Sequence, residues 1–184
     1  PHSHCDVGWL ETVESYYKLN VTKILDNVYN SLIEDTTGNR RFIWSEVSYF
    51  SFWYDSQPID IKNNIKKLVQ NGILEFVDGG WVQHDESVVT IDAIIQQMKL
   101  GHSYLKKKFN VTPKIGWQID PFGSSITTPT IFAKMGFIAN VFSRAPDVIK
   151  QKLIDGGNMA FIWAGSNSIP NSNLLTLLFT NGYC

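Results

Sequence analysis

Short apolar runs and amphipathic helical segments alternate along this chain, and this alternation restricts the possible folds more than any other feature. Apolar runs bounded by turn residues predict strands, and apolar residues spaced three and four apart predict helices. The predicted strands are Phe42–Val47, Ile73–Val77, Lys114–Asp120, Phe137–Phe142, Ala160–Trp163 and Leu174–Phe179. The predicted helices cover residues 21–32, 58–71, 91–108, 126–135 and 147–153. Such alternation indicates right-handed βαβ units and a parallel sheet, either open or closed into a barrel.

Length and charge exclude several classes of protein. The 184 residues are 43% hydrophobic and 18% charged, which suits one globular domain, and no internal boundary is indicated. The formal net charge of −1 argues against nucleic acid or an anionic membrane as a partner. No apolar run reaches the roughly 18 residues of a membrane span. No signal peptide precedes Pro1, and we expect the chain to begin inside a longer protein.

The cysteines and sequons say little about the compartment. Cys5 and Cys184 stand at opposite ends of the chain and do not form a disulfide framework. Asn20 and Asn110 each begin an Asn-Val-Thr glycosylation sequon. Because such tripeptides also occur by chance, they give only weak support to a secretory route.

The N-terminus carries two histidines and an aspartate at alternate positions, His2, His4 and Asp6. Side chains two apart in an extended segment face the same way, and imidazole nitrogen and carboxylate oxygen are usual zinc ligands in hydrolytic sites. The pattern therefore indicates a metal site, although a polar chain end without function would have the same composition. Cys5 is a weaker candidate, since its side chain should point away from His4 and Asp6.

A second candidate residue ends a predicted strand, where Trp117-Gln118-Ile119 leads into Asp120. Pro121 has no N–H to donate to a neighbouring strand, so the strand stops there. In α/β barrels, groups at the carboxyl ends of strands form the active site. Asp120 is therefore a candidate catalytic residue, and an ordinary Asp-Pro turn is the alternative interpretation.

Together the two motifs resemble the class II α-mannosidases of glycoside hydrolase family 38, of the acid, lysosomal type. The resemblance is also carried by residues 42–46, 74–82, 85–86, 135–137 and 178–183, in the family's order. It implies that residues 1–184 are the N-terminal portion of a catalytic domain. The implied fold is α/β, a parallel β/α barrel with seven strands, of which this chain holds an incomplete part.

The resemblance also implies an activity. The expected enzyme is a retaining α-mannosidase that uses Zn²⁺ to hydrolyse terminal α-mannose residues of glycans, as in glycoprotein and N-glycan degradation. Its partner would be a mannose-containing oligosaccharide, and its location the lysosome or the secretory pathway. The family's general acid and a further histidine ligand would lie beyond residue 184, so we expect the chain alone to be inactive.

The same resemblance assigns individual residues. His4, Asp6 and Asp120 are implied to be the zinc ligands, with Asp120 also the nucleophile, and His2 is implied to support the ligands. Trp9 is expected to stack on the apolar face of the sugar, and without the family match a core role would be equally good.

Further residues are assigned to substrate binding or are set aside. Asp85 and Glu86 are expected to bind sugar hydroxyls or to satisfy loop amides. Arg144 matches a family arginine near the nucleophile, where it could hold the carboxylate in place, and an ordinary surface arginine is the alternative interpretation. His84 and His102 match no ligand of the family. Ser124 stands where the family normally has a histidine, which puts the support of the metal site in doubt.

Two other functions compete with this one. A metal-dependent polysaccharide deacetylase also places aspartate and histidine at barrel strand ends, but it does not explain Trp9 or the Gly80-Trp81 stretch. A non-catalytic carbohydrate- or zinc-binding fragment would need no general acid. Continuation of the reading frame into a second half of the barrel would favour the enzyme.

Overall fold

The computed structural model describes residues 1–179, whose contacts divide them into two compact units. Unit 1 comprises Pro1–Val82 and Ile95–Thr112, and unit 2 comprises Gln83–Ile94 and the chain from Pro113 onward. The helices are α1 (Val13–Tyr16), the π-helical turn η1 (Tyr17–Val21), α2 (Thr22–Ile33), α3 (Val47–Ser56), α4 (Ile59–Gln70), α5 (Ile91–Phe109), α6 (Thr127–Met135) and α7 (Asp147–Asp155). The strands are β1 (Phe42–Trp44), β2 (Leu74–Phe76), β3 (Ile115–Gln118), β4 (Ala139–Phe142), β5 (Ala160–Trp163) and β6 (Leu174–Leu178).

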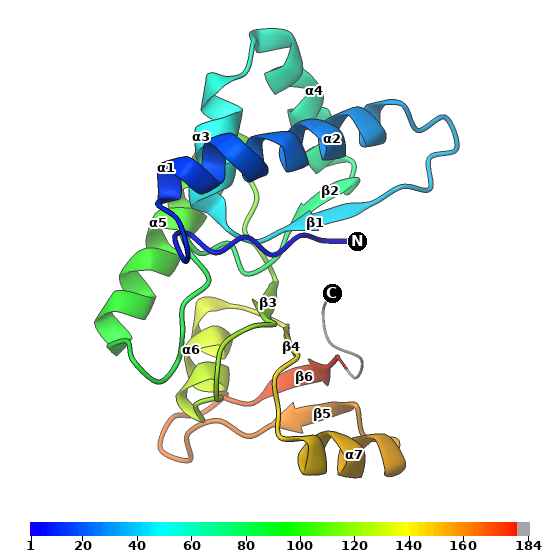
Figure 1. Ribbon diagram of the computed structural model, residues 1–184. Helices are drawn as coiled ribbons and strands as arrows, with labels where there is room; N and C mark the ends of the chain where they lie inside the picture. The colour runs from blue at the N-terminus through cyan, green and yellow to red at the C-terminus, as the bar shows by residue number, and fades with distance from the viewer. Residues whose placement is uncertain (180–184) are drawn as a thin grey trace. The chain divides into compact units, whose positions relative to one another are not determined.

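Unit 1 is built on a small parallel sheet. β1 pairs with β2, with Phe42 opposite Leu74 and Trp44 opposite Phe76. The N-terminal segment runs along β1 in the same direction, joined by a single bridge between His2 and Ile43 (Figure 1). The N-terminal segment, β1 and β2 run in the same direction, so their carboxyl ends lie at the same edge of this sheet. Functional side chains are commonly found at that edge of a parallel sheet.

An aromatic core holds the helices of unit 1 to its sheet. The ring of Phe50 on α3 lies 4.8 Å from the ring of Phe76 on β2, and Tyr54 lies 4.8 Å from Phe109 at the end of α5. Phe50 is fully buried. Aromatic pairs at this separation stabilise a core beyond their buried area alone, so this cluster fixes α3 and α5 against β2.

Gly101 allows α5 to lie directly against the backbone of residues 79–81. A Cβ at position 101 would overlap the Gly79 carbonyl oxygen and lie 2.7 Å from the Gly80 carbonyl carbon. We expect Gly101→Ala to lower the free energy of unfolding by about 1–3 kcal/mol, because backbone atoms cannot rotate away from the added methyl group. Thermal denaturation followed by circular dichroism measures the change. The exposed Ser103→Ala on the same helix should stay within about 0.5 kcal/mol, and an equal effect of both would contradict the close packing.

Unit 2 contains a four-stranded sheet in the order β3-β4-β6-β5 (Figure 1). β3, β4 and β6 are parallel, and β5 runs antiparallel to β6. Helix α6 connects β3 to β4, and it ends at Gly136, whose φ of 86° is the left-handed conformation that favours glycine. The strand ends of β3 and β4 thus lie side by side at one edge of the sheet.

The structure confirms most predicted elements but corrects two predictions. The strand predicted over Phe42–Val47 ends at Trp44, and α3 follows where no helix was predicted. Seven of the ten α3 residues are buried, so the helix lacks the one-sided apolar stripe from which a helix is recognised. β5 breaks the predicted parallel arrangement, because the connection between Trp163 and Leu174 is too short for a crossover. The prediction that residues 1–184 form one portion of a catalytic domain stays a prediction.

Residues 1–179 therefore form a mixed α/β fold with parallel strands in both units. A closed barrel of seven strands is not present in this part of the chain, whose named strands form two separate sheets. Within the same residues, no helix combines the length and the apolar character needed to cross a membrane.

Candidate metal centre and nucleophile

The N-terminal segment of unit 1 brings a histidine and an aspartate together. His4 Nε2 lies 3.3 Å from Asp6 Oδ1. The backbone turns immediately afterwards, since Gly8 has a φ of 87° and its N–H donates to the Asp6 carbonyl at 3.0 Å. Tyr49 on α3 also donates its hydroxyl proton to that carbonyl at 2.9 Å. The position of Asp6 is thus fixed by two hydrogen bonds to its backbone.

A buried acid lies on the other side of the same imidazole. Glu46 Oε1 is 3.5 Å from His4 Nδ1, and the Glu46 side chain is only 1% exposed. His4 itself is 11% exposed, whereas Asp6 is 44% exposed. The imidazole therefore lies between one carboxylate in the interior and one at the surface.

These carboxylates make the position of His4 strongly favourable for a cation. Burial opposes a positive charge on the imidazole, but hydrogen bonds to Asp6 and Glu46 outweigh it and raise the pKa of His4 to about 10. The hydrogen bond from His4 holds the pKa of Asp6 below its usual range. A divalent metal bound at Nε2 would balance the negative charge of the neighbouring carboxylates, as the proton on His4 does here. His4 and Asp6 each offer a ligand atom, so unit 1 supplies two of the residues that could hold a metal ion.

Two neighbouring residues differ from these ligands. Burial is the main cause that raises the pKa of the Cys5 thiol to about 12, and the side chain packs in the core of unit 1. A thiol that keeps its proton is a poor metal ligand, which agrees with the expectation that Cys5 points away from the site. Burial lowers the pKa of His2, so this imidazole stays neutral near neutral pH.

In unit 2 the structure pairs Asp120 with Arg144. The Oδ1 atom of Asp120 lies 2.6 Å from Arg144 Nε and 2.5 Å from Nη2. Sheet register explains the contact, because Gln118 on β3 is opposite Phe142 on β4, and Asp120 and Arg144 each lie two residues beyond the end of their strand. Charge-assisted hydrogen bonds of this kind fix the orientation of a carboxylate. The predicted proximity of Arg144 to Asp120 is therefore confirmed.

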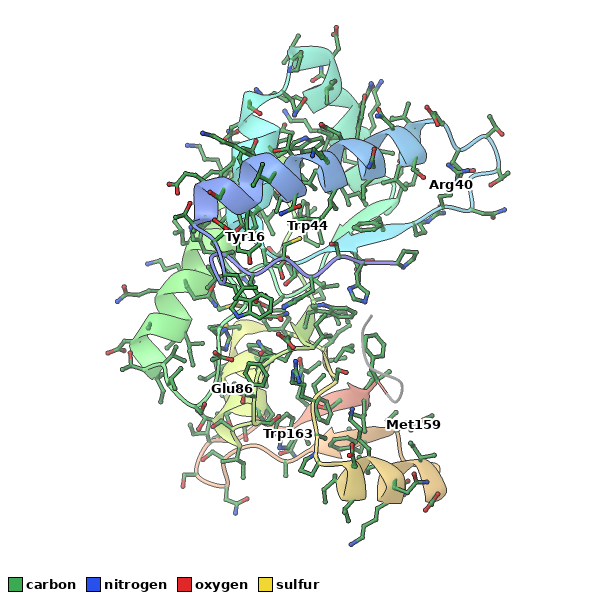
Figure 2. All side chains as sticks on the ribbon, viewed as in Figure 1. Tyr16, Arg40, Trp44, Glu86, Met159 and Trp163 are labelled. Atoms are coloured by element: carbon green, nitrogen blue, oxygen red, sulfur yellow. The ribbon has the colours of Figure 1, made fainter. Side chains whose placement is uncertain are left out.

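A cleft of about 670 Å³ lies beside this ion pair within unit 2. The side chains around it include Phe122, Ser124, Phe142, Arg144, Phe161 and Trp163, the last labelled in Figure 2. The guanidinium carbon of Arg144 lies 4.4 Å from the centre of the Phe122 ring. A mostly apolar cleft with a few polar groups is the usual character of a small-molecule site. Ser124 contributes only a small hydroxyl to it.

The remaining predicted residues are Trp9 in unit 1 and Asp85 and Glu86 in unit 2. Trp9 is 73% exposed on the surface of unit 1. Asp85 lies in the loop before α5, and its role stays a prediction. The neighbouring Glu86, labelled in Figure 2, accepts a hydrogen bond from the Ser125 backbone N–H, so it satisfies a loop amide as one interpretation expected.

Two histidines that sequence analysis set aside have other partners. His84 is buried, its ring lies 6.2 Å from that of Phe132, and burial lowers its pKa to about 4. His102 Nε2 lies 2.8 Å from the Asp78 carbonyl oxygen. In contrast, sequence analysis gave Glu46 no role. Glu46 follows β1 by two residues, as Asp120 follows β3, but the predicted strand Phe42–Val47 ran through it.

Comparison with known proteins shows the family. A family model described as "Glycosyl hydrolases family 38 N-terminal domain" matches residues 1–184. Alpha-mannosidase C of Dictyostelium discoideum is 42% identical over all of this chain, and alpha-mannosidase B of the same organism is 50% identical over 82% of it. The lysosomal alpha-mannosidase of that organism is 37% identical over the whole chain. The chain spans 18%, 14% and 19% of the lengths of these three relatives.

Solved structures agree on the fold. An alpha-mannosidase from Enterococcus faecalis V583 superimposes with a TM-score of 0.78 and 22% identity, and the match covers 100% of this chain and 20% of that protein. The identity is low, so this likeness supports the fold alone. The family model and the relatives together establish that this chain belongs to glycoside hydrolase family 38, as part of its N-terminal domain.

Proposed function

We propose that this chain supplies the metal ligands and the nucleophile of a zinc-dependent, retaining α-mannosidase. The observation that carries the proposal is that each unit holds one half of the required chemistry. Unit 1 offers the His4–Asp6 pair, and unit 2 offers Asp120, held by Arg144. The relatives are named alpha-mannosidases, which supports mannose-containing glycans as substrates. Membership of family 38 also favours this activity over a polysaccharide deacetylase.

The donors suit zinc. Imidazole nitrogen and carboxylate oxygen are its common ligands in hydrolytic enzymes, and the acidic surroundings of His4 favour a cation. In the proposed site His4, Asp6 and Asp120 hold the metal. When bound, zinc would orient the mannose hydroxyls and favour the ionised form of nearby carboxylates.

The chain's own residues would then carry the first covalent step. Asp120 attacks the anomeric carbon as the bond to the leaving oxygen breaks, and a glycosyl ester forms on its carboxylate. Arg144 donates hydrogen bonds to Oδ1, which keeps the carboxylate oriented for attack. Water later cleaves the ester and restores Asp120, so that two inversions give net retention. Protonation of the leaving oxygen needs a general acid, which the family resemblance places outside this chain.

We further propose the lysosome or the secretory pathway as the location. Both sequon asparagines, Asn20 and Asn110, are exposed. Asn110 directly follows α5 with a φ of 59°, in a turn rather than within a helix. One relative is a lysosomal alpha-mannosidase, which supports the same route.

Zinc binding tests the metal site directly. We expect Asp6→Ala to weaken the zinc affinity of the chain by at least about 10²-fold. Removal of a residue that only supports a metal ligand costs up to about 10²-fold, and removal of a ligand should cost at least as much. Competition with a chelating dye measures the dissociation constant. Asp60→Ala, an exposed acid in the first turn of α4, is the matched control and should bind zinc like the unchanged chain. Equal affinity of the two variants would contradict the proposed ligands.

A further inference from the structure

Glu46 is a fully buried acid that the proposed mechanism does not use. It follows β1 by two residues, at the carboxyl end of the unit 1 sheet. A carboxylate in the interior is costly unless a charged or hydrogen-bonding partner compensates for the lost hydration. The partner that the geometry provides is His4, whose Nδ1 atom lies 3.5 Å away. This distance is at the outer limit of a hydrogen bond, and such contacts in a site without its ligand can shorten when the ligand binds.

The backbone around Glu46 holds the side chain in this place. Trp44 donates its indole N–H to the Glu46 carbonyl oxygen at 2.9 Å, and the Val47 N–H donates to the Gly80 carbonyl at 3.0 Å. The bridge between His2 and Ile43 places the N-terminal segment beside β1, so His4 reaches the strand end from the neighbouring segment. The proximity of Glu46 and His4 is therefore a consequence of sheet pairing rather than of a flexible side chain.

Capping of α3 is the main alternative role for this acid. Glu46 occupies the N-cap position, where a side-chain oxygen commonly accepts a backbone N–H of the first turn. The Glu46 side chain makes no such capping hydrogen bond. Its carboxylate is directed to the imidazole instead, which separates it from an ordinary helix cap.

The two ring nitrogens of His4 have different partners. Nε2 lies next to Asp6, and Nδ1 lies next to Glu46. A histidine that binds a metal through one nitrogen donates its other N–H to a second group, which fixes the tautomer and the ring orientation. From this arrangement we propose that Glu46 is a positioning residue, which accepts the Nδ1–H of His4 and so presents Nε2 to the metal. This inference rests on the proposed metal site.

The unchanged chain offers the first test. Nitrogen-15 spectra of the zinc-loaded, histidine-labelled chain should show His4 with a protonated Nδ1 and a metal-bound Nε2. The chain has four histidines, and His4→Ala identifies the His4 signals. Metal bound through Nδ1 would overturn the inference without any change to Glu46.

Variants of Glu46 provide the second test. We expect Glu46→Gln, which keeps the shape and a weaker acceptor, to reduce zinc affinity by about 10-fold to 100-fold, and Glu46→Ala to reduce it further. The Nδ1–H resonance of His4 should also shift in Glu46→Gln. Ser48→Ala, which removes another buried polar side chain nearby, is the control and should leave both readouts unchanged. Circular dichroism establishes that each variant is folded.

The outcomes separate this inference from the proposed function. Loss of zinc affinity in Asp6→Ala together with unchanged affinity and spectra in Glu46→Gln would refute the role of Glu46 alone. Unchanged affinity in His4→Ala and Asp6→Ala would refute the metal site, and the inference with it. A lower melting temperature of Glu46→Gln with unchanged zinc affinity and an unchanged Nδ1–H signal would assign Glu46 to folding only.

Discussion

Asp120→Asn should reduce hydrolysis of an aryl α-mannoside on the order of 10⁴-fold or more in a catalytic domain completed to the length of the relatives, a scale measured for lost catalytic-triad residues in another hydrolase. An amide cannot form the glycosyl ester, so the first covalent step is lost. The amide also loses the charge that pairs with Arg144 at 2.5 Å. The rate constant for release of the aryl group, measured at saturating substrate, reports this step.

The leaving group distinguishes the nucleophile from other roles of Asp120. A highly activated aryl mannoside needs little help from a general acid but still needs the attacking carboxylate. The loss in Asp120→Asn should therefore persist with activated substrates. Asp147→Asn, an exposed acid in the first turn of α7, is the matched control and should keep the normal rate. A near-normal rate of Asp120→Asn on the activated substrate would show that Asp120 is not the nucleophile.

The two acids at strand ends show what could be predicted from sequence in this chain. Asp120 was identified because Pro121 marks the end of its strand, and its contact with Arg144 follows once β3 and β4 are adjacent and in register. Register is a tertiary property, so the contact itself could be expected only from the family resemblance. Glu46 follows β1 in the same way, but the strand was predicted to continue through it. Because the predicted strand extended past its true end at Trp44, Glu46 was not recognised as a residue at a strand end.

Helices with one apolar face were predicted well, and α3 was not, for a single physical reason. α2 and α4 bury residues on one side and show a periodic stripe, whereas α3 has seven of its ten residues buried and is apolar on most sides. Its run of aromatic residues from Tyr49 to Tyr54 has no polar face to define a period. Burial on most sides removes the signal that sequence reasoning uses.

The antiparallel orientation of β5 could have been predicted from the length of the connection to β6, although the alternation of strands and helices suggested a parallel sheet. Parallel neighbours need a crossover of about a dozen residues or more, and fewer lie between Trp163 and Leu174. The boundaries of β5 were predicted correctly, but the general prediction of a parallel sheet did not use this length. Loop length therefore carries topological information even where strand positions are clear.

The largest contrast that we expect is between this chain alone and a completed catalytic domain. The chain spans 14% to 19% of three relatives, and the family resemblance places the general acid and one further zinc ligand outside it. Loss of general acid catalysis typically costs about 10²–10⁴-fold, and weaker metal binding adds to that loss. We therefore expect no measurable turnover of an alkyl α-mannoside by the 184-residue chain.

The dependence on the leaving group identifies the cause of that contrast. If the missing acid limits the rate, the deficit of the chain relative to the completed domain should shrink as the leaving group becomes more acidic. A deficit of the same size for every leaving group would instead indicate that the nucleophile or the metal site is not formed in the chain alone. Zinc titration of the same samples separates these two cases, because His4, Asp6 and Asp120 all belong to the chain. Turnover of an alkyl α-mannoside at the rate of the completed domain would contradict the placement of the general acid.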